Sequence, residues 1–272
     1  MPNSVLIPGN SALVTGASLG IGRATAQRLA GLGMNVCLVD LPSADLEQST
    51  AEVAKNAAGK IVSVSADVAL EGDWESIRQT VESEFGSLQF LMNNAVTRIG
   101  RGFDAPLAEW RRALEVNFWG VVMGVQTLLP MMLEDGRRGR IVNVGSKQGI
   151  TNPPGHPIYN IAKSAVKTYS EQLQHELRNR QNPNVSVHLL VPGWTTTGKN
   201  EHKKGAWLPH QVVDFMIEHI EADDFYVICP DDEVSQDRDK RRILWGAQDI
   251  TENRPPLSRW HADFKDEAAK VC

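Results

Sequence analysis

Cysteine is scarce in this chain of 272 residues, which contains only Cys37, Cys229 and Cys272. The three are far apart and form no Cys-x-x-Cys pair, so the sequence suggests neither a disulfide framework nor a zinc site. Cys37 lies in an apolar run and is expected to be a small buried hydrophobe. We therefore expect no metal centre.

An excess of positive charge and long apolar runs are also missing. The formal net charge is -5, which argues against an electrostatic nucleic-acid binder. The short basic cluster Arg137, Arg138 and Arg140 is interpreted as a solvated turn before a strand. The longest apolar stretch, Val121 to Leu133, is too short to span a bilayer, and no signal-peptide pattern precedes the first expected strand. We expect a cytoplasmic protein with neither a membrane nor a nucleic-acid partner.

Short apolar runs alternate with longer amphipathic segments along most of the chain. The runs cover 12–15, 35–39, 61–65, 90–92, 140–144, 185–191 and 225–228. Helices are expected to begin near Arg23, Ala44, Glu71, Pro106, Pro157 and Pro209. Apolar strands with helices between them predict an α/β fold, a doubly wound parallel sheet with helices on both faces.

The pattern weakens after residue 230. The stretch 230–240 is strongly charged, and the sequence 253–256 contains two prolines that prevent a regular helix. We expect a single domain over residues 1–230. An irregular extension over 231–272, with a short helix near 258–270, is expected to pack on that domain or on a partner subunit.

A glycine-rich loop follows the first expected strand and opens a helix. Its sequence from residue 15 is Thr-Gly-Ala-Ser-Leu-Gly-Ile-Gly. Glycines let the backbone approach a pyrophosphate closely, and a helix N-terminus supplies free N–H groups and a partial positive charge. Between a strand and a helix, this loop predicts a dinucleotide-binding site.

Two aspartates follow the next strands. Asp40 lies 18 residues beyond Gly22, where a carboxylate reaches the adenosine ribose and repels a 2′-phosphate. Leu19 offers no positive charge for that phosphate, so the pair favours NAD over NADP. Asp67, which precedes Val68, can bond the adenine amino group or cap the next helix, and the sequence leaves both open.

Tyr159 and Lys163 are four positions apart, which places both side chains on one face of a helix. A free phenol ionises only near pH 10, but a neighbouring ammonium favours the phenolate. The spacing thus predicts a tyrosine that exchanges protons at working pH. Ser146 follows an expected strand, and its hydroxyl can hold a substrate oxygen that develops negative charge.

These motifs, in this order from residue 10 to 197, resemble the short-chain dehydrogenase/reductase family. The resemblance rests on the glycine loop, Asn93-Asn94-Ala95, Asn117, Ser146, the Tyr159–Lys163 pair and Pro192-Gly193. It implies a Rossmann-like fold and hydride transfer between NAD and a secondary alcohol or its ketone. It also implies a catalytic tetrad of Asn117, Ser146, Tyr159 and Lys163, in which Asn117 distorts its helix and holds a water that links Lys163 to solvent.

The resemblance also implies a set of cofactor contacts along the carboxyl ends of the strands. These are Gly16, Ser18, Leu19, Gly20, Ile21, Asp40, Leu41, Asp67, Val68, Asn94, Ala95, Val96, Tyr159, Lys163, Pro192, Gly193, Thr195 and Thr197. The two threonines lie in the segment that contacts nicotinamide in the family, although they can instead cap the following helix. Val96 departs from the family, which usually has glycine there.

The substrate pocket and the assembly are less determined. Candidates to line the pocket are Lys147, Gln148, Asn152, His156, Trp194 and Trp207; Lys147 and Gln148 can equally be solvated loop residues. The ending 228–232 lacks the turn that supports tetramers in the family, so a homodimer through 106–133 and 157–180 is expected, with a tetramer as the alternative. Two other functions stay open: an NADP-dependent carbonyl reductase of the same family, and a non-enzymatic dinucleotide-binding regulator.

Overall fold

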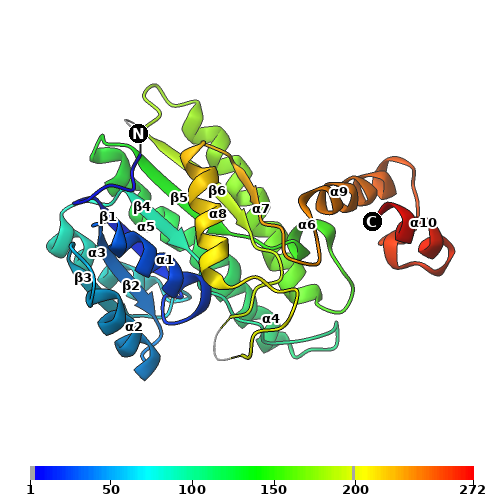
Figure 1. Cartoon of the computed structure of the whole chain (residues 1–272), viewed down its shortest axis with the longest axis horizontal. Coiled ribbons are helices and arrows are strands. Elements are labelled where there is room, and N and C mark those ends of the chain that lie inside the picture. The colour runs from blue at the N-terminus through cyan, green and yellow to red at the C-terminus, as the bar shows by residue number, and fades with distance from the viewer. Residues whose placement is uncertain (1–3, 198–199) are drawn as a thin grey trace.

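A single parallel sheet forms the centre of the computed structural model, which describes residues 4–197 and 200–272 (Figure 1). Its seven strands are β1 (Ser11–Thr15), β2 (Asn35–Asp40), β3 (Ile61–Ser65), β4 (Phe90–Asn93), β5 (Gly139–Val144), β6 (Val185–Val191) and β7 (Tyr226–Ile228). Their order is β3-β2-β1-β4-β5-β6-β7, and every neighbouring pair is parallel. Each apolar run predicted from the sequence is a strand, so the predicted doubly wound sheet is confirmed.

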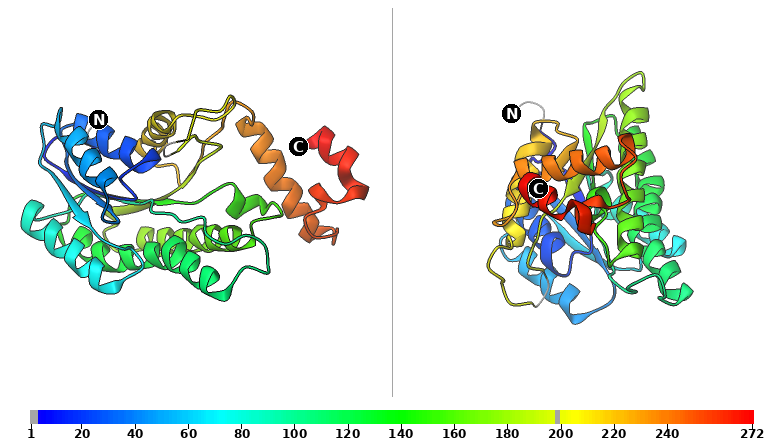
Figure 2. Two further views of the ribbon diagram at one scale, coloured as in Figure 1. Left: turned by 90° about the horizontal axis from the view of Figure 1, so that it is seen from below. Right: turned by 90° about the vertical axis from the view of Figure 1, so that its right-hand side faces the viewer.

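Helices cover both faces of this sheet, as Figure 2 shows. One face is packed by α1 (Gly20–Gly31), α2 (Ala44–Ala54) and α8 (Pro209–Glu221); the other by α3 (Glu71–Phe85), α5 (Gly120–Glu134) and α7 (Pro157–Arg178). Alternate residues of a strand point to opposite faces, so Leu38 joins the first layer and Cys37 the second. Cys37 is fully buried, which confirms the prediction made for it.

One long apolar helix lies in the second layer. The helix α4 (Leu107–Leu114), the π-helical turn η1 (Glu115–Trp119) and α5 form a continuous segment, Leu107–Glu134. The segment has 28 residues and contains an 18-residue window with a mean hydropathy of 1.4, so it matches a membrane span by length and composition, and the apolar stretch estimated from the sequence, Val121 to Leu133, was too short. Half of that apolar window is buried inside the protein against the sheet, as expected of a core helix.

The C-terminal residues form an arm that extends away from the sheet (Figures 1 and 2). It consists of α9 (Gln236–Thr251), η2 (Ser258–Trp260), η3 (Ala262–Phe264) and α10 (Lys265–Val271). The arm has a small core around Trp245, whose indole N–H donates to Ser258 Oγ at 2.7 Å. It meets the rest of the protein where α9 contacts α6 (Gln148–Thr151).

The helix α9 differs from the expectation of an irregular segment, which was based on the charged stretch 230–240. The helix begins after Ser235, whose hydroxyl accepts the N–H of Arg238, and Asp237 and Asp239 lie in its first turn. A serine cap with acidic residues behind it is a recognised start signal. The short helix predicted near 258–270 is present as η2, η3 and α10.

Candidate active site

The glycine loop lies at the carboxyl edge of the sheet, beside β4. The chain order reverses between β1 and β4, and ligands of doubly wound folds bind at such a point. Gly16 has φ +65°, and a Cβ there would lie 2.8 Å from Asn94 Nδ2. A Cβ on Gly22 would lie 2.1 Å from the Gly16 carbonyl oxygen, so both positions require glycine.

The side chain of Asn94 holds the backbone of the glycine loop. Its amide donates to the carbonyl oxygens of Thr15 and Gly16 at 2.9 and 3.1 Å. The backbone N–H groups of Asn94 and Ala95 both donate to Thr15 Oγ1. The neighbouring Val96 is half exposed. The side-chain N–H donors of Asn94 thus fix the loop backbone.

The loop and Asp40 fit a dinucleotide. Ser18 Oγ is buried and has no hydrogen-bond partner in the described part of the chain. The Asp40 carboxylate faces the loop, where it accepts the N–H of Ser18 at 2.9 Å and that of Leu41 at 2.8 Å. Leu19 is the N-terminal flanking residue of α1, and Ile21 lies buried in its first turn. The Asp40 carboxylate can accept hydrogen bonds from a ribose, and the free Ser18 hydroxyl and the glycine-loop backbone can donate hydrogen bonds to a pyrophosphate. These residues therefore fit a dinucleotide.

Asp67 has partners that the sequence did not reveal. One carboxylate oxygen accepts from Arg112 at 2.6 Å and the other accepts the N–H of Ala69 at 3.0 Å. The N-cap of α3 is Leu70, so the helix-capping alternative for Asp67 is wrong. Val68 is buried against Gly120 of α5, and its carbonyl accepts the Trp74 indole N–H.

Tyr159 and Lys163 lie one turn apart near the start of α7. Lys163 Nζ is 5.9 Å from the centroid of the Tyr159 ring and donates to the Val144 carbonyl at 2.7 Å. Lys163 is 2% exposed. Burial, reinforced by the charge of Arg98, lowers the pKa of Lys163 to about 7. This ammonium can therefore hold or release a proton at neutral pH, which suits a group that relays protons.

The lowered pKa of Lys163 predicts a specific pH dependence of stability. In the unfolded chain this lysine stays protonated up to about pH 10, whereas in the ligand-free fold it loses its proton near pH 7. The unfolded state therefore binds more protons between these values, and this contribution to the free energy of unfolding rises with pH. We therefore expect Lys163→Met to raise the free energy of unfolding, relative to wild type, by more at pH 7 than at pH 9. Denaturant titrations at the two pH values measure this difference.

Lys167→Met is the matched control, because Lys167 lies on the same helix in an ion pair with Glu171. Its effect should be the same at both pH values. An equally pH-independent effect of Lys163→Met would contradict the prediction.

Ser146 is held against α7 through α6. Its hydroxyl accepts the N–H of Gln148 at 3.2 Å and so starts α6. A Cβ on Gly149 would lie 2.5 Å from the Lys163 carbonyl carbon, and Ser164 donates to the Gly149 carbonyl. Close approach of α6 to α7 thus brings Ser146 to the same edge as Tyr159. Gln148 Oε1 is buried without a partner in the described residues, while His156 flanks the start of α7.

Asn117 lies in the π-helical turn η1, so the helix distortion that the resemblance implied is present. Its side-chain amide clamps one residue of the loop after β4: Nδ2 donates to the Thr97 carbonyl and Oδ1 accepts the Thr97 N–H, both at 2.8 Å. The side chain is buried, and each end of its amide makes one of these bonds. Asn117 thereby fixes the loop that passes over Tyr159.

The segment after β6 folds over the glycine loop. A Cβ on Gly20 would lie 3.2 Å from Thr197 Cβ, and Thr195 forms a bridge with Trp207. The next helix, α8, has Leu208 as its N-cap, so the alternative that these threonines cap a helix is wrong. The indole N–H of Trp207 donates to Asp232, which holds this tryptophan in the fold beside the site.

Asp231 is a hub that sequence analysis did not identify. Its buried carboxylate accepts from the backbone N–H groups of Trp194, Glu233 and Val234 at 2.8 to 3.1 Å. Lys147 Nζ lies 3.3 Å from Asp231 and 2.6 Å from Asp239 of α9. Lys147, a candidate to line the substrate pocket, is thus engaged in ion pairs. Asp231 and Lys147 together connect three parts of the chain: the segment after Ser146, the segment after Gly193 and the C-terminal arm.

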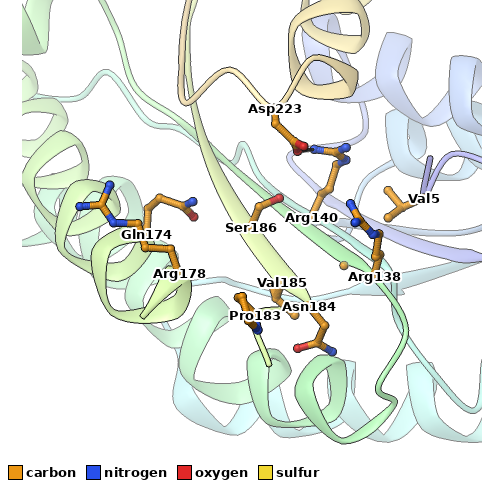
Figure 3. A pocket seen from close by; sticks show the side chains of 11 residues that line it. Val5, Arg138, Arg140, Gln174, Arg178, Pro183, Asn184, Val185, Ser186 and Asp223 are labelled. Carbon is orange, nitrogen blue, oxygen red and sulfur yellow. Dashed lines mark hydrogen bonds and ion pairs between the residues drawn. The ribbon is translucent and has the colours of Figure 1, made fainter. Parts of the chain in front are cut away.

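A separate cavity of about 220 Å³ lies at the opposite edge of the sheet, at the amino ends of β5 and β6 (Figure 3). Arg140 borders it and is 3% exposed, bonded to Asp223 at 2.6 Å. The prediction of a solvated basic turn was therefore wrong for Arg140, because β5 carries it into the protein. Parallel strands place this cavity far from Ser146 and Tyr159.

Comparisons with known proteins agree with this geometry. The family described as short chain dehydrogenase matches residues 10–206. A 3-oxoacyl-(acyl-carrier-protein) reductase of Synechocystis sp. is 33% identical over 70% of this chain and 76% of that protein. A short chain dehydrogenase/reductase from Burkholderia phymatum, solved in complex with NAD, has TM-score 0.83 and 26% identity over 93% of this chain and 98% of its own. A metagenomic short-chain oxidoreductase in complex with NADP, with TM-score 0.70 and 24% identity over 82% of this chain and 98% of its own, supports the fold alone. The chain belongs to the short-chain dehydrogenase family of oxidoreductases.

Proposed function

We propose that this protein is an NAD-dependent dehydrogenase that interconverts a secondary alcohol and its ketone. The observation that carries the proposal is the Tyr159–Lys163 pair: the half-buried phenol lies 5.9 Å from a buried ammonium that is bonded to Val144 at the carboxyl end of β5. A regulator that only binds a dinucleotide has no need of a phenol beside a buried ammonium. The proposal therefore favours an enzyme over a non-catalytic regulator.

In alcohol oxidation, Tyr159, Ser146 and Lys163 each have a separate role. Tyr159 accepts the hydroxyl proton of the substrate, and Ser146 donates a hydrogen bond to the same oxygen. Lys163 stabilises the phenolate by its charge and passes protons onward. Bound nicotinamide supplies the chemistry of hydride acceptance. In the reverse direction Tyr159 returns its proton to the ketone oxygen.

Asp40 supports NAD as the cofactor. Its carboxylate lies at the end of β2 and faces Ser18 of the glycine loop. There it can accept hydrogen bonds from ribose hydroxyls and repel a 2′-phosphate. The neighbouring Leu41 is half exposed and carries no charge that would attract this phosphate.

We expect wild type to bind NADH more tightly than NADPH, and Asp40→Ala to weaken NADH binding by roughly 10- to 100-fold. Hydrogen bonds to a charged group contribute about 1.5–3 kcal/mol, and every 1.4 kcal/mol changes affinity tenfold. Loss of the carboxylate should also remove the repulsion of NADPH. Fluorescence titration of both cofactors measures the two affinities.

Glu47→Ala is the control for Asp40→Ala, because Glu47 is an exposed acid on the neighbouring helix α2. It should leave the preference between cofactors unchanged. Tighter binding of NADPH than NADH by wild type would instead support the NADP-dependent carbonyl reductase.

We further propose a cytoplasmic homodimer formed through α4, η1, α5 and α7. Exposed apolar side chains lie on these helices, among them Leu107, Trp119 and Ile161. Burial of such a face is the usual reason for helix pairing between subunits.

A further inference from the structure

A second cation lies beside the reacting phenol. Arg98, in the loop after β4, places its guanidinium carbon 4.9 Å from the centroid of the Tyr159 ring. Lys163 Nζ is 5.9 Å from the same centroid. The charge of Arg98 reaches the catalytic pair, because it contributes to the lowered pKa of Lys163. Arg98 lies outside every motif of the sequence, so only the structure reveals its place beside Tyr159.

The loop that carries Arg98 is fixed on both sides of this residue. On one side, Thr97 is clamped by two hydrogen bonds of 2.8 Å to the amide of Asn117. On the other, a Cβ on Gly100 would lie 2.6 Å from Cδ1 of Ile158, the residue before Tyr159. The backbone of Arg98 is therefore held against the start of α7, and its side chain has a short path to the phenol.

The charge of Arg98 is not neutralised within the fold. In residues 4–197 and 200–272 no carboxylate lies within ion-pair distance of its guanidinium, which is solvent-exposed. Two other cations near the site are paired: Lys147 with Asp231 and Asp239, and Arg112 with Asp67. An unpaired guanidinium at the mouth of a site is free to bind an anion from solution.

We propose that Arg98 binds a carboxylate of the substrate, and that the enzyme acts on hydroxy acids or the corresponding oxo acids. A guanidinium presents a planar fork of N–H donors that matches a carboxylate in two parallel hydrogen bonds. The reacting oxygen must lie at the Tyr159 hydroxyl while Arg98 lies over the ring of the same residue. The carboxylate is therefore separated from the reacting carbon by only a short chain. This inference rests on the proposed function, because it assumes that Tyr159 marks the position of the reacting oxygen.

Paired substrates that differ only in this charge test the proposal. The probes are 3-hydroxybutyrate and mandelate, each against its methyl ester, with NAD and wild type, Arg98→Met or Arg98→Lys. Wild type should favour the acids in kcat/KM. Arg98→Met should lower the ratio of kcat/KM for the acid to kcat/KM for its ester by roughly 10- to 100-fold, the loss expected for a charge-assisted hydrogen-bond pair. Arg98→Lys should retain part of the preference, because it keeps the charge without the fork.

Arg101→Met is the matched control, since Arg101 is an exposed arginine in the same loop. It should leave the ratio of acid to ester unchanged. An equal ratio in wild type and Arg98→Met would overturn the proposal, as would a preference of wild type for the esters.

A binding measurement separates this proposal from the proposed function. Acetoacetate, in the presence of NAD, which has no hydride to give to a ketone, should raise the thermal midpoint of wild type but not that of Arg98→Met, and its methyl ester should act equally on both. If no alcohol is turned over yet acetoacetate stabilises only wild type, the dehydrogenase proposal fails and the Arg98 site stands. If neutral alcohols are turned over and acetoacetate acts equally on both proteins, the Arg98 site is refuted and the dehydrogenase stands.

Discussion

Tyr159→Phe should lower kcat by about 10²- to 10⁴-fold, the contribution usual for a general acid or base. The variant keeps the aromatic ring that contacts Arg98 and Lys163 but loses the hydroxyl that exchanges a proton with the substrate. Binding of NADH should be retained, because the glycine loop and Asp40 are untouched. Steady-state oxidation of secondary alcohols, followed by NADH absorbance, measures the loss, and fluorescence titration measures the binding.

Tyr169→Phe provides the control for Tyr159→Phe on the same helix. Tyr169 packs edge-on against Phe118 and has no role in the proposed chemistry. Its variant should keep kcat close to wild type. Wild-type turnover by Tyr159→Phe would remove this residue from the mechanism and with it the basis of the proposed function.

Asp231→Ala should destabilise the protein by about 3 kcal/mol, the lower end for breaking a buried ion pair. The change leaves the N–H groups of Trp194, Glu233 and Val234 without their acceptor and removes one partner of Lys147. For a chain of this size we expect a thermal midpoint roughly 6–12 °C lower. Turnover should fall as well, because the segments after Ser146 and Gly193 share this anchor.

Asp232→Ala serves as the matched control, since Asp232 is an exposed carboxylate with one bond to Trp207. It should change the midpoint far less. A double-mutant cycle with Lys147→Met measures the pair itself: the two substitutions should be less than additive. Additive effects, or a midpoint of Asp231→Ala equal to wild type, would show that the hub does not hold the arm to the site.

Local patterns predicted much of the fold because each pattern acts within a few residues. The apolar runs at 35–39 and 185–191 became β2 and β6, and prolines marked the starts of α7 and α8. The helix α9 was missed because its buried side is narrow, with only Asp239 and Trp245 buried along its length. Its stability comes from Ser258 and the packing of α10, which no pattern within residues 236–251 contains.

The sequence by itself determined three features: the positions of the strands along the chain, the glycine loop and the Tyr159–Lys163 pair. Helix geometry alone places residues four apart on one face, so this pair needs no further information. Only the tertiary structure decided that Arg98 lies over the Tyr159 ring and that Lys147 pairs with Asp231, 84 residues away. Such contacts depend on how the sheet and its loops close in space, since bringing together residues far apart in the chain costs loop-closure entropy that packing of the whole core must offset.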